Sequence, residues 1–202
     1  MKKVLALGLV SLALVQAKVF LGVQGGYDLG VGLTKTGTLD APIWKGATTG
    51  GWSAGANLGL EHGEGFFGVR YFLSFDYSAP LANSNVYKSL NVFDVDLNLD
   101  LLLNFVHGGS FGFGMFLGTG VGYQYAFFKS GANNAQSSFG AAPIFGRAGL
   151  TFSLGEHSRF DVGVKIPIIA FSIHRNAAHV ANLGDPNYYS PLKIQASYRF
   201  LF

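Results

Sequence analysis

The chain has 202 residues, of which 49% are hydrophobic, 15% aromatic and only 12% charged, with 29 glycines and no cysteine. The lack of cysteine excludes a disulfide framework and a thiolate metal site. Lys2 and Lys3 supply two of the fourteen basic residues, which leaves twelve cations against eleven acids in the rest of the chain. That nearly neutral balance does not favour a nucleic-acid partner.

The first 17 residues predict a signal peptide. Two lysines are followed by an apolar core of twelve residues, Val4–Val15, and Val15-Gln-Ala17 offers a cleavage site. A helix needs about 20 apolar residues to span a bilayer, so this core is too short to be a membrane anchor. We expect residues 1–17 to be the signal peptide and residues 18–202 to form the mature domain.

Eight later segments alternate apolar residues with small or polar ones, the period of two that a strand requires. In the clearest, Phe93 to Phe105, the apolar side chains interleave with Asp94, Asp96 and Asp100. Pro143 and Pro167 cannot donate to a sheet ladder, and we expect both near strand ends or bulges. The segments cover residues 19–31, 52–61, 67–77, 93–105, 111–127, 144–154, 159–168 and 192–202.

Charge position shows what each face of these segments contacts. Thirteen charged residues lie in the segments, and all thirteen share the parity of the small and polar residues. A charged residue facing lipid at mid-membrane costs about 2–4 kcal/mol, so this separation predicts lipid on one face and a polar lumen on the other. A soluble barrel such as a lipocalin, the alternative, would carry its charge outside.

The connectors alternate between short and long. Short ones cover 62–65, 106–110 and 155–158, and long ones cover 32–51, 78–89, 129–140 and 174–191. This alternation, with both termini on the short side, is typical of outer-membrane barrels with periplasmic turns and extracellular loops. The predicted fold class is all-β: an eight-stranded antiparallel transmembrane β-barrel.

The interior of an eight-stranded barrel is narrow enough to be filled by side chains, and buried charges need partners. We therefore predict a lumenal charge network, with Asp96 and Asp100 as the first partners of Arg70 and Asp94 as the next. A narrow channel beside the glycines of segment 111–127 is the alternative. The predicted network comprises Asp28, Arg70, Asp76, Asp94, Asp96, Asp100, Arg147, Asp161, Lys165 and Arg199.

Histidines give little support for metal or enzyme chemistry. His62, His107 and His157 fall in three different turns, too far apart around a barrel to share a metal, so we predict neither a metal site nor a cofactor. The stretch from His174 to Asn176 is similar to the His-x-Ser-Asn motif of lipid A deacylase barrels, in which His is the base and Ser the nucleophile. Asn176 offers no hydroxyl, so we predict no catalytic residues and no enzyme.

The chain ends in Tyr198-Arg-Phe-Leu-Phe202, with Tyr198, Phe200 and Phe202 on one face. This ending resembles the C-terminal assembly signal of outer-membrane proteins, which the barrel-assembly machinery recognises. With the signal peptide, the glycine- and aromatic-rich segments and the asparagine-containing loops, it resembles small members of the Helicobacter outer-membrane protein family and OmpA/OmpX-type barrels. The resemblance implies a monomeric barrel in the bacterial cell outer membrane.

From these features we expect a non-enzymatic integral outer-membrane protein with a structural or surface-interaction role. Its expected partners are outer-membrane lipid, lipopolysaccharide and the barrel-assembly machinery, with a host-surface ligand as a further candidate. A narrow pore is the alternative, and a lipid A-modifying hydrolase is the third reading. Aromatic residues beside cations in the long connectors are candidates for partner binding. They are equally candidates for girdle residues that anchor the barrel in the headgroup layer. These residues are Trp44, Lys45, Tyr87, Lys88, Arg175, Tyr188 and Tyr189.

Overall fold

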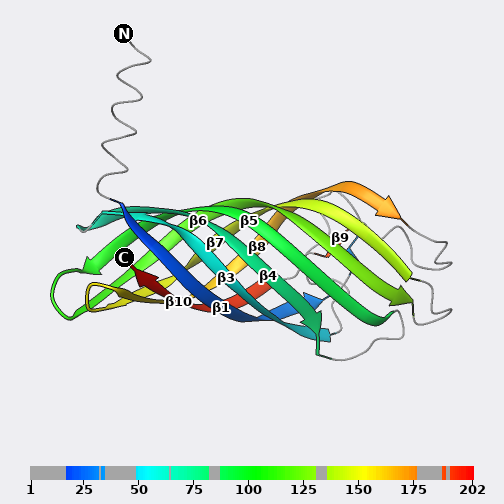
Figure 1. Cartoon of the computed structure of the whole chain (residues 1–202), viewed down its shortest axis with the longest axis horizontal. Coiled ribbons are helices and arrows are strands. Elements are labelled where there is room, and N and C mark those ends of the chain that lie inside the picture. Colours follow the sequence, from blue (N-terminus) through cyan, green and yellow to red (C-terminus); the bar gives the residue numbers. More distant parts are fainter. Residues whose placement is uncertain are drawn as a thin grey trace, which may run out of the picture.

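The computed structural model describes residues 17–31, 33–34, 49–63, 65–81, 87–130, 136–176, 188–189 and 192–202. Eight long strands close into a barrel in the order β1-β10-β8-β7-β6-β5-β4-β3, and the paired strands are antiparallel (Figure 1). The predicted eight-stranded antiparallel barrel is confirmed. The predicted signal peptide, apart from Ala17, lies outside the described residues.

The strands are longer than the alternating segments at the end where the long connectors lie. β5 to β8 contain 19 or 20 residues each, about twice the 9–11 that a tilted strand needs to cross a membrane. Figure 1 shows these four strands reaching farther than β1, β3 and β4 at the end opposite the termini. The barrel strands are β1 (Lys18–Val31), β3 (Thr49–His62), β4 (Phe67–Pro80), β5 (Tyr87–Val106), β6 (Phe111–Ser130), β7 (Gln136–Leu154), β8 (Ser158–Asn176) and β10 (Leu192–Leu201).

Two short strands add a second sheet at the loop end. Leu33–Thr34 (β2) pairs with Tyr188–Tyr189 (β9), and neither takes part in the closed barrel. This pairing joins the connector that follows β1 to the connector that precedes β10. Among the described residues, no helix is both long enough and apolar enough to cross a membrane.

The opposite end of the barrel carries the tight turns. Gly63, Gly108, Gly109 and Gly155 lie in these turns with positive φ angles of 98°, 89°, 82° and 68°. Glycine adopts such angles without the penalty that a Cβ atom brings. The N-terminal strand begins and the C-terminal strand ends here, where the Phe202 amide donates to the carbonyl oxygen of Val19 at 2.8 Å.

The two strand prolines coincide with irregular pairing. Ile144 of β7 pairs with Ile169 and Phe145 pairs with Pro167, so Ile168 bulges out of the β7–β8 ladder. Pro167 therefore lies at a bulge, as expected, whereas Pro143 lies well inside β7 and next to the same shift. Beyond the bulge the outward positions of β8 change from even to odd numbers.

Large apolar side chains cover the outer surface, as the alternation predicts. Near the turns, ring contacts link Phe66, Phe105, Phe113 and Phe152 along neighbouring strands. Near the loop end a second row links Trp52, Tyr77, Phe93 and Phe127. Two aromatic rows with aliphatic side chains between them match the girdles and apolar band of an outer-membrane barrel.

Depth between the two girdles sets the cost of a charge on this surface. Leu99 and Leu154 are similarly exposed, at 52% and 57%, but Leu99 lies between the girdles and Leu154 at the turn end of β7. Leu99→Arg should destabilise the barrel by about 2–4 kcal/mol and Leu154→Arg by about 1 kcal/mol or less. Denaturant unfolding of the protein in lipid vesicles measures both values, and equal losses would contradict the assigned membrane position.

Candidate functional site: the lumenal charge network

The inner face of the barrel gathers nearly all the charge of the described strands. Alternate residues of each strand point inward, and the thirteen charged residues of the predicted segments all occupy these positions. Eleven of them are buried, and the side chains of Arg147 and Arg159 are 11% and 19% exposed. The ten residues predicted for the network lie on this face with Glu61, Arg159 and Lys193, which the prediction omitted.

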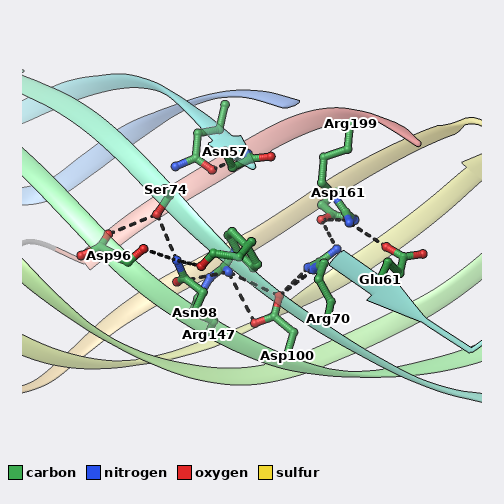
Figure 2. A network of polar contacts seen from close by, with 12 residues as sticks. Asn57, Glu61, Arg70, Ser74, Asp96, Asn98, Asp100, Arg147, Asp161 and Arg199 are labelled. Carbon is green, nitrogen blue, oxygen red and sulfur yellow. Dashed lines mark hydrogen bonds and ion pairs between the residues drawn. The ribbon is translucent and has the colours of Figure 1, made fainter. Parts of the chain in front are cut away.

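Arg70 lies at the centre of the group nearer the turns (Figure 2). Its Nε and Nη2 atoms donate to Asp100 Oδ2 at 3.0 and 2.5 Å, and its Nη1 atom donates to Asp161 Oδ2 at 2.9 Å. Arg147 approaches the same Asp100 oxygen at 3.3 Å. Two carboxylates from different sides of the lumen therefore hold one guanidinium that is 1% exposed.

Arg199 extends this group to the last strand. Its Nη2 atom donates to both carboxylate oxygens of Asp161 at 2.7 Å, and its Nη1 atom donates to Glu61 Oε2 at 2.8 Å. Arg159 contacts the other oxygen of Glu61 at 3.3 Å. The ion pairs thus run without a break from β5 through β4 and β8 to β10 and β3.

A second group lies nearer the loop end. Lys165 donates to Asp96 Oδ2 at 2.5 Å, and Lys193 donates to Asp94 Oδ2 at 2.9 Å. Asp76 accepts a hydrogen bond from the Gln24 amide at 2.7 Å. Asp28 is fully buried on the same inward face of β1, where its register partner is Lys193.

The expected partners of Arg70 are therefore corrected. Asp100 is a partner, but Asp96 and Asp94 are held by lysines, and Asp161 is a partner that we did not expect. Register explains the difference, because Arg70 lies opposite Asp100 whereas Asp96 lies four residues farther along β5, about 13 Å away at the rise of a strand. Asp161 reaches Arg70 across the lumen, and neighbouring-strand reasoning does not include such contacts.

Aromatic rings fill the space between the ions. The guanidinium of Arg147 lies 4.7 Å from the centre of the Phe72 ring, and that of Arg70 lies 5.2 Å from the centre of the Phe116 ring. The ammonium of Lys165 lies 4.0 Å from the centre of the Phe145 ring. These distances are in the range of cation–π attraction.

The glycines of β6 make room for side chains from neighbouring strands. A Cβ atom on Gly120 would lie 2.5 Å from the Phe145 ring, and Cβ atoms on Gly118 and Gly122 would overlap the carboxylates of Asp100 and Asp96. The space beside these glycines is therefore occupied by side chains of β5 and β7. A cavity nearby has a volume of about 10 Å³, room for about one water; its lining includes Gln24, Phe116, Arg147, Asp161 and Gln195.

Two of the three turn histidines, His62 and His157, take part in local contacts. His62 Nε2 lies 2.7 Å from the Tyr71 hydroxyl oxygen, and His157 Nδ1 lies 2.8 Å from the Leu201 carbonyl oxygen. Within the described ranges, no group of three or more histidine and acidic residues is arranged to hold a metal ion. The side chains of His174 and Asn176, on which the enzyme alternative depends, lie outside the described residues.

Removing the central guanidinium should be costly. Arg70→Ala would leave Asp100 and Asp161 short of a partner in the interior, and breaking a buried pair on one side costs about 3–5 kcal/mol. Arg159→Ala is the matched control, because its partly exposed pair with Glu61 should contribute about 1 kcal/mol or less. Urea unfolding in vesicles tests both, and a loss at Arg70 no larger than at Arg159 would count against the network as a stabilising element.

Residues 55–202 match the family model described as Helicobacter outer membrane protein. The crystal structure of Neisserial surface protein A is similar, with a TM-score of 0.55, 10% sequence identity, and coverage of 92% of this chain and 99% of that chain. A major outer membrane protein from Thermus thermophilus is similar with a TM-score of 0.52 at 13% identity, over 92% of this chain and 99% of that chain. No curated protein sequence matches the chain.

At these identities the two structures show a shared fold, and the family model shows the relationship. It covers well over half of the chain. The matched part begins at Gly55 inside β3 and includes all of the barrel strands that follow β3. The match places the barrel in the bacterial outer membrane, with outer-membrane lipid around its apolar face. The chain belongs to the Helicobacter outer membrane protein family.

Proposed function

We propose that this outer-membrane barrel is a non-enzymatic surface protein that acts through its extracellular connectors. The observation that carries the proposal is the filled lumen, in which ion pairs and aromatic rings from neighbouring and opposite strands meet. A lumen occupied in this way offers no path for solutes. Interaction with partners then takes place on the outer surface and at the loop end.

The length of β5 to β8 supports the same proposal. β5 and β6 continue past their girdle residues Phe93 and Phe127, and β7 and β8 pair alongside them. A rigid sheet of this kind holds the connectors away from the membrane surface, where loops commonly bind partners. Trp44 and Lys45 of the first connector lie outside the described residues, as do the side chains of Tyr87, Lys88, Arg175, Tyr188 and Tyr189.

Export and assembly form part of the proposal. We infer that residues 1–17 direct secretion and that the barrel-assembly machinery binds the outward face of β10. Tyr198, Phe200 and Phe202 are 45%, 42% and 68% exposed, and the rings of Phe200 and Phe202 are in contact. An exposed aromatic face at the end of the chain is available to such a partner. A monomer suffices for this arrangement, because the closed sheet leaves no strand of the barrel unpaired.

A narrow pore is the main alternative, and electrical recording separates it from the proposal. Purified protein refolded and added to a planar lipid bilayer should give no stable unitary conductance, because the network closes the lumen. Arg70→Ala provides the comparison, since loss of the central guanidinium should raise the frequency of brief openings. A stable conductance of the unchanged protein would favour the pore.

The hydrolase alternative is tested by mass spectrometry of lipid A from expressing cells with and without His174.

Deleting connectors tests the surface role directly. Bacteria that express the protein should adhere to cultured epithelial cells more than bacteria that carry an empty vector. Removal of residues 36–46 or of residues 178–186 should reduce that adherence, because both ranges belong to the long connectors that we propose as the binding surface. Both deletions spare the barrel strands. Glu156→Ala, a change at an exposed residue of the turn at the other end, is the control and is not expected to alter adherence.

Each deletion must leave the barrel intact for this comparison. Unheated samples of a folded barrel migrate differently on gels from heated ones, so migration confirms folding in each strain. Adherence that is equal in the vector strain, the full-length strain and both deletion strains would contradict the surface-interaction proposal for host cells.

A further inference from the structure

The last strand brings cations, and no acids, to the lumen. Five residues of β10 occupy inward positions, and the charged ones are Lys193 and Arg199, each 2% exposed. They lie six residues apart, one near each end of the strand. The remaining inward residues are Gln195, Ser197 and Leu201.

Both cations reach strands that are not beside β10 in the barrel wall. Lys193 contacts Asp94 on β5, which lies four strands from β10 around the barrel, and Ser78 on β4, both at 2.9 Å. Arg199 contacts Glu61 on β3 at 2.8 Å as well as Asp161 on the adjacent β8. Its guanidinium also lies 5.0 Å from the centre of the Phe20 ring on β1. The contacts of β10 therefore cross the lumen and bridge the β1–β10 seam.

The charge of the described lumen balances when β10 is in place. The inward positions carry seven acids and seven cations, if Lys18 at the rim, opposite Glu61, is included. Without β10 the same positions carry seven acids and five cations. The acids are Asp28, Glu61, Asp76, Asp94, Asp96, Asp100 and Asp161, and the cations are Lys18, Arg70, Arg147, Arg159, Lys165, Lys193 and Arg199.

We propose that Lys193 and Arg199 form an electrostatic latch through which the last strand closes the barrel. β10 pairs with both β1 and β8, so its docking converts an open sheet into a closed one. The unfinished lumen then carries an excess of two negative charges, and β10 presents two positive charges to it. Attraction between complementary charges speeds an encounter before close contacts form.

A variant at Arg147 distinguishes a role of the β10 cations in closure from a role in the stability of the finished barrel. Arg147 is also a lumenal cation in contact with Asp100, but β7, an interior strand of the sheet, supplies it. If lumenal cations only stabilise the finished barrel, loss of Arg147 and loss of the β10 cations should affect folding in the same way. If β10 docks by charge, loss of the β10 cations should slow closure, whereas loss of Arg147 should not.

The test is the folding rate of the full mature chain on dilution from urea into lipid vesicles. Closure is followed by the changed gel migration of unheated samples. Lys193→Gln combined with Arg199→Gln should slow closure at low salt by about tenfold. Raising the salt from about 0.02 M to about 1 M, where the screening length falls to about 3 Å, should slow the unchanged protein but not this variant.

Arg147→Gln is the matched control: it leaves both β10 cations in place and makes the unfinished lumen more negative, so it should not slow closure and should keep the salt dependence. Lys193→Asp should slow closure more than Lys193→Gln, because it presents an acid to Asp94 and to its register partner Asp28. A salt-independent rate for the unchanged protein, or an equal slowing by Arg147→Gln, would overturn the latch. Should the double Gln variant not close, the salt dependence of the unchanged protein and the comparison with Arg147→Gln still decide the matter.

Discussion

Pairing of buried charge is the constraint on which this barrel depends. An eight-stranded barrel encloses a space that side chains fill, so a carboxylate in the lumen cannot be solvated by bulk water. Each charge must instead lie within hydrogen-bond distance of an opposite charge or a polar group, because an unpaired buried ion is strongly destabilising. Asp161 meets this need through two guanidiniums, those of Arg70 and Arg199, and joins β4 and β10 to β8 in doing so.

The same constraint accounts for residues that carry no charge. Glycines on β6 leave the volume that Asp96, Asp100 and Phe145 occupy, so the small residues of one strand and the large residues of others form one packed interior. The outer surface follows the opposite rule, with large apolar side chains exposed to lipid and held by ring contacts. The alternation in the sequence therefore reflects two environments: the lipid bilayer outside the barrel and a network of ion pairs inside it.

Much of this architecture could be predicted from the sequence, because a period of two with charge on one parity has few physical interpretations. The inward positions of Glu61 and Lys193 followed from that parity, yet their partners did not. Pairing depends on register and on reach across the lumen, and a single strand carries no information about the strand opposite it. The upper parts of β5 to β8 were also missed, since the parity of the apolar residues changes there. In β8 the bulge at Ile168 moves the outward positions to Ile169, Phe171 and Ile173, and in β5 the apolar Leu90 and Val92 are buried. Pro143 inside β7 shows that sheet continuity tolerates a missing donor when the adjacent register shifts.

The two ends of the closed barrel are held together by different contacts. At the turn end, the Phe202 amide, the His157 ring and the Arg199 guanidinium hold the last strand against β1, β8 and β3. At the loop end, β8 continues past Lys165, the last residue that pairs with β10, while β5, β6 and β7 continue beside it. The turn end is thus held by side-chain and backbone contacts of the last strand, whereas the loop end is held by backbone pairing among β5 to β8. Between the two ends, the barrel is stabilised by buried ion pairs that contact neither lipid nor bulk water, because a lumen of this width leaves charges no other partner.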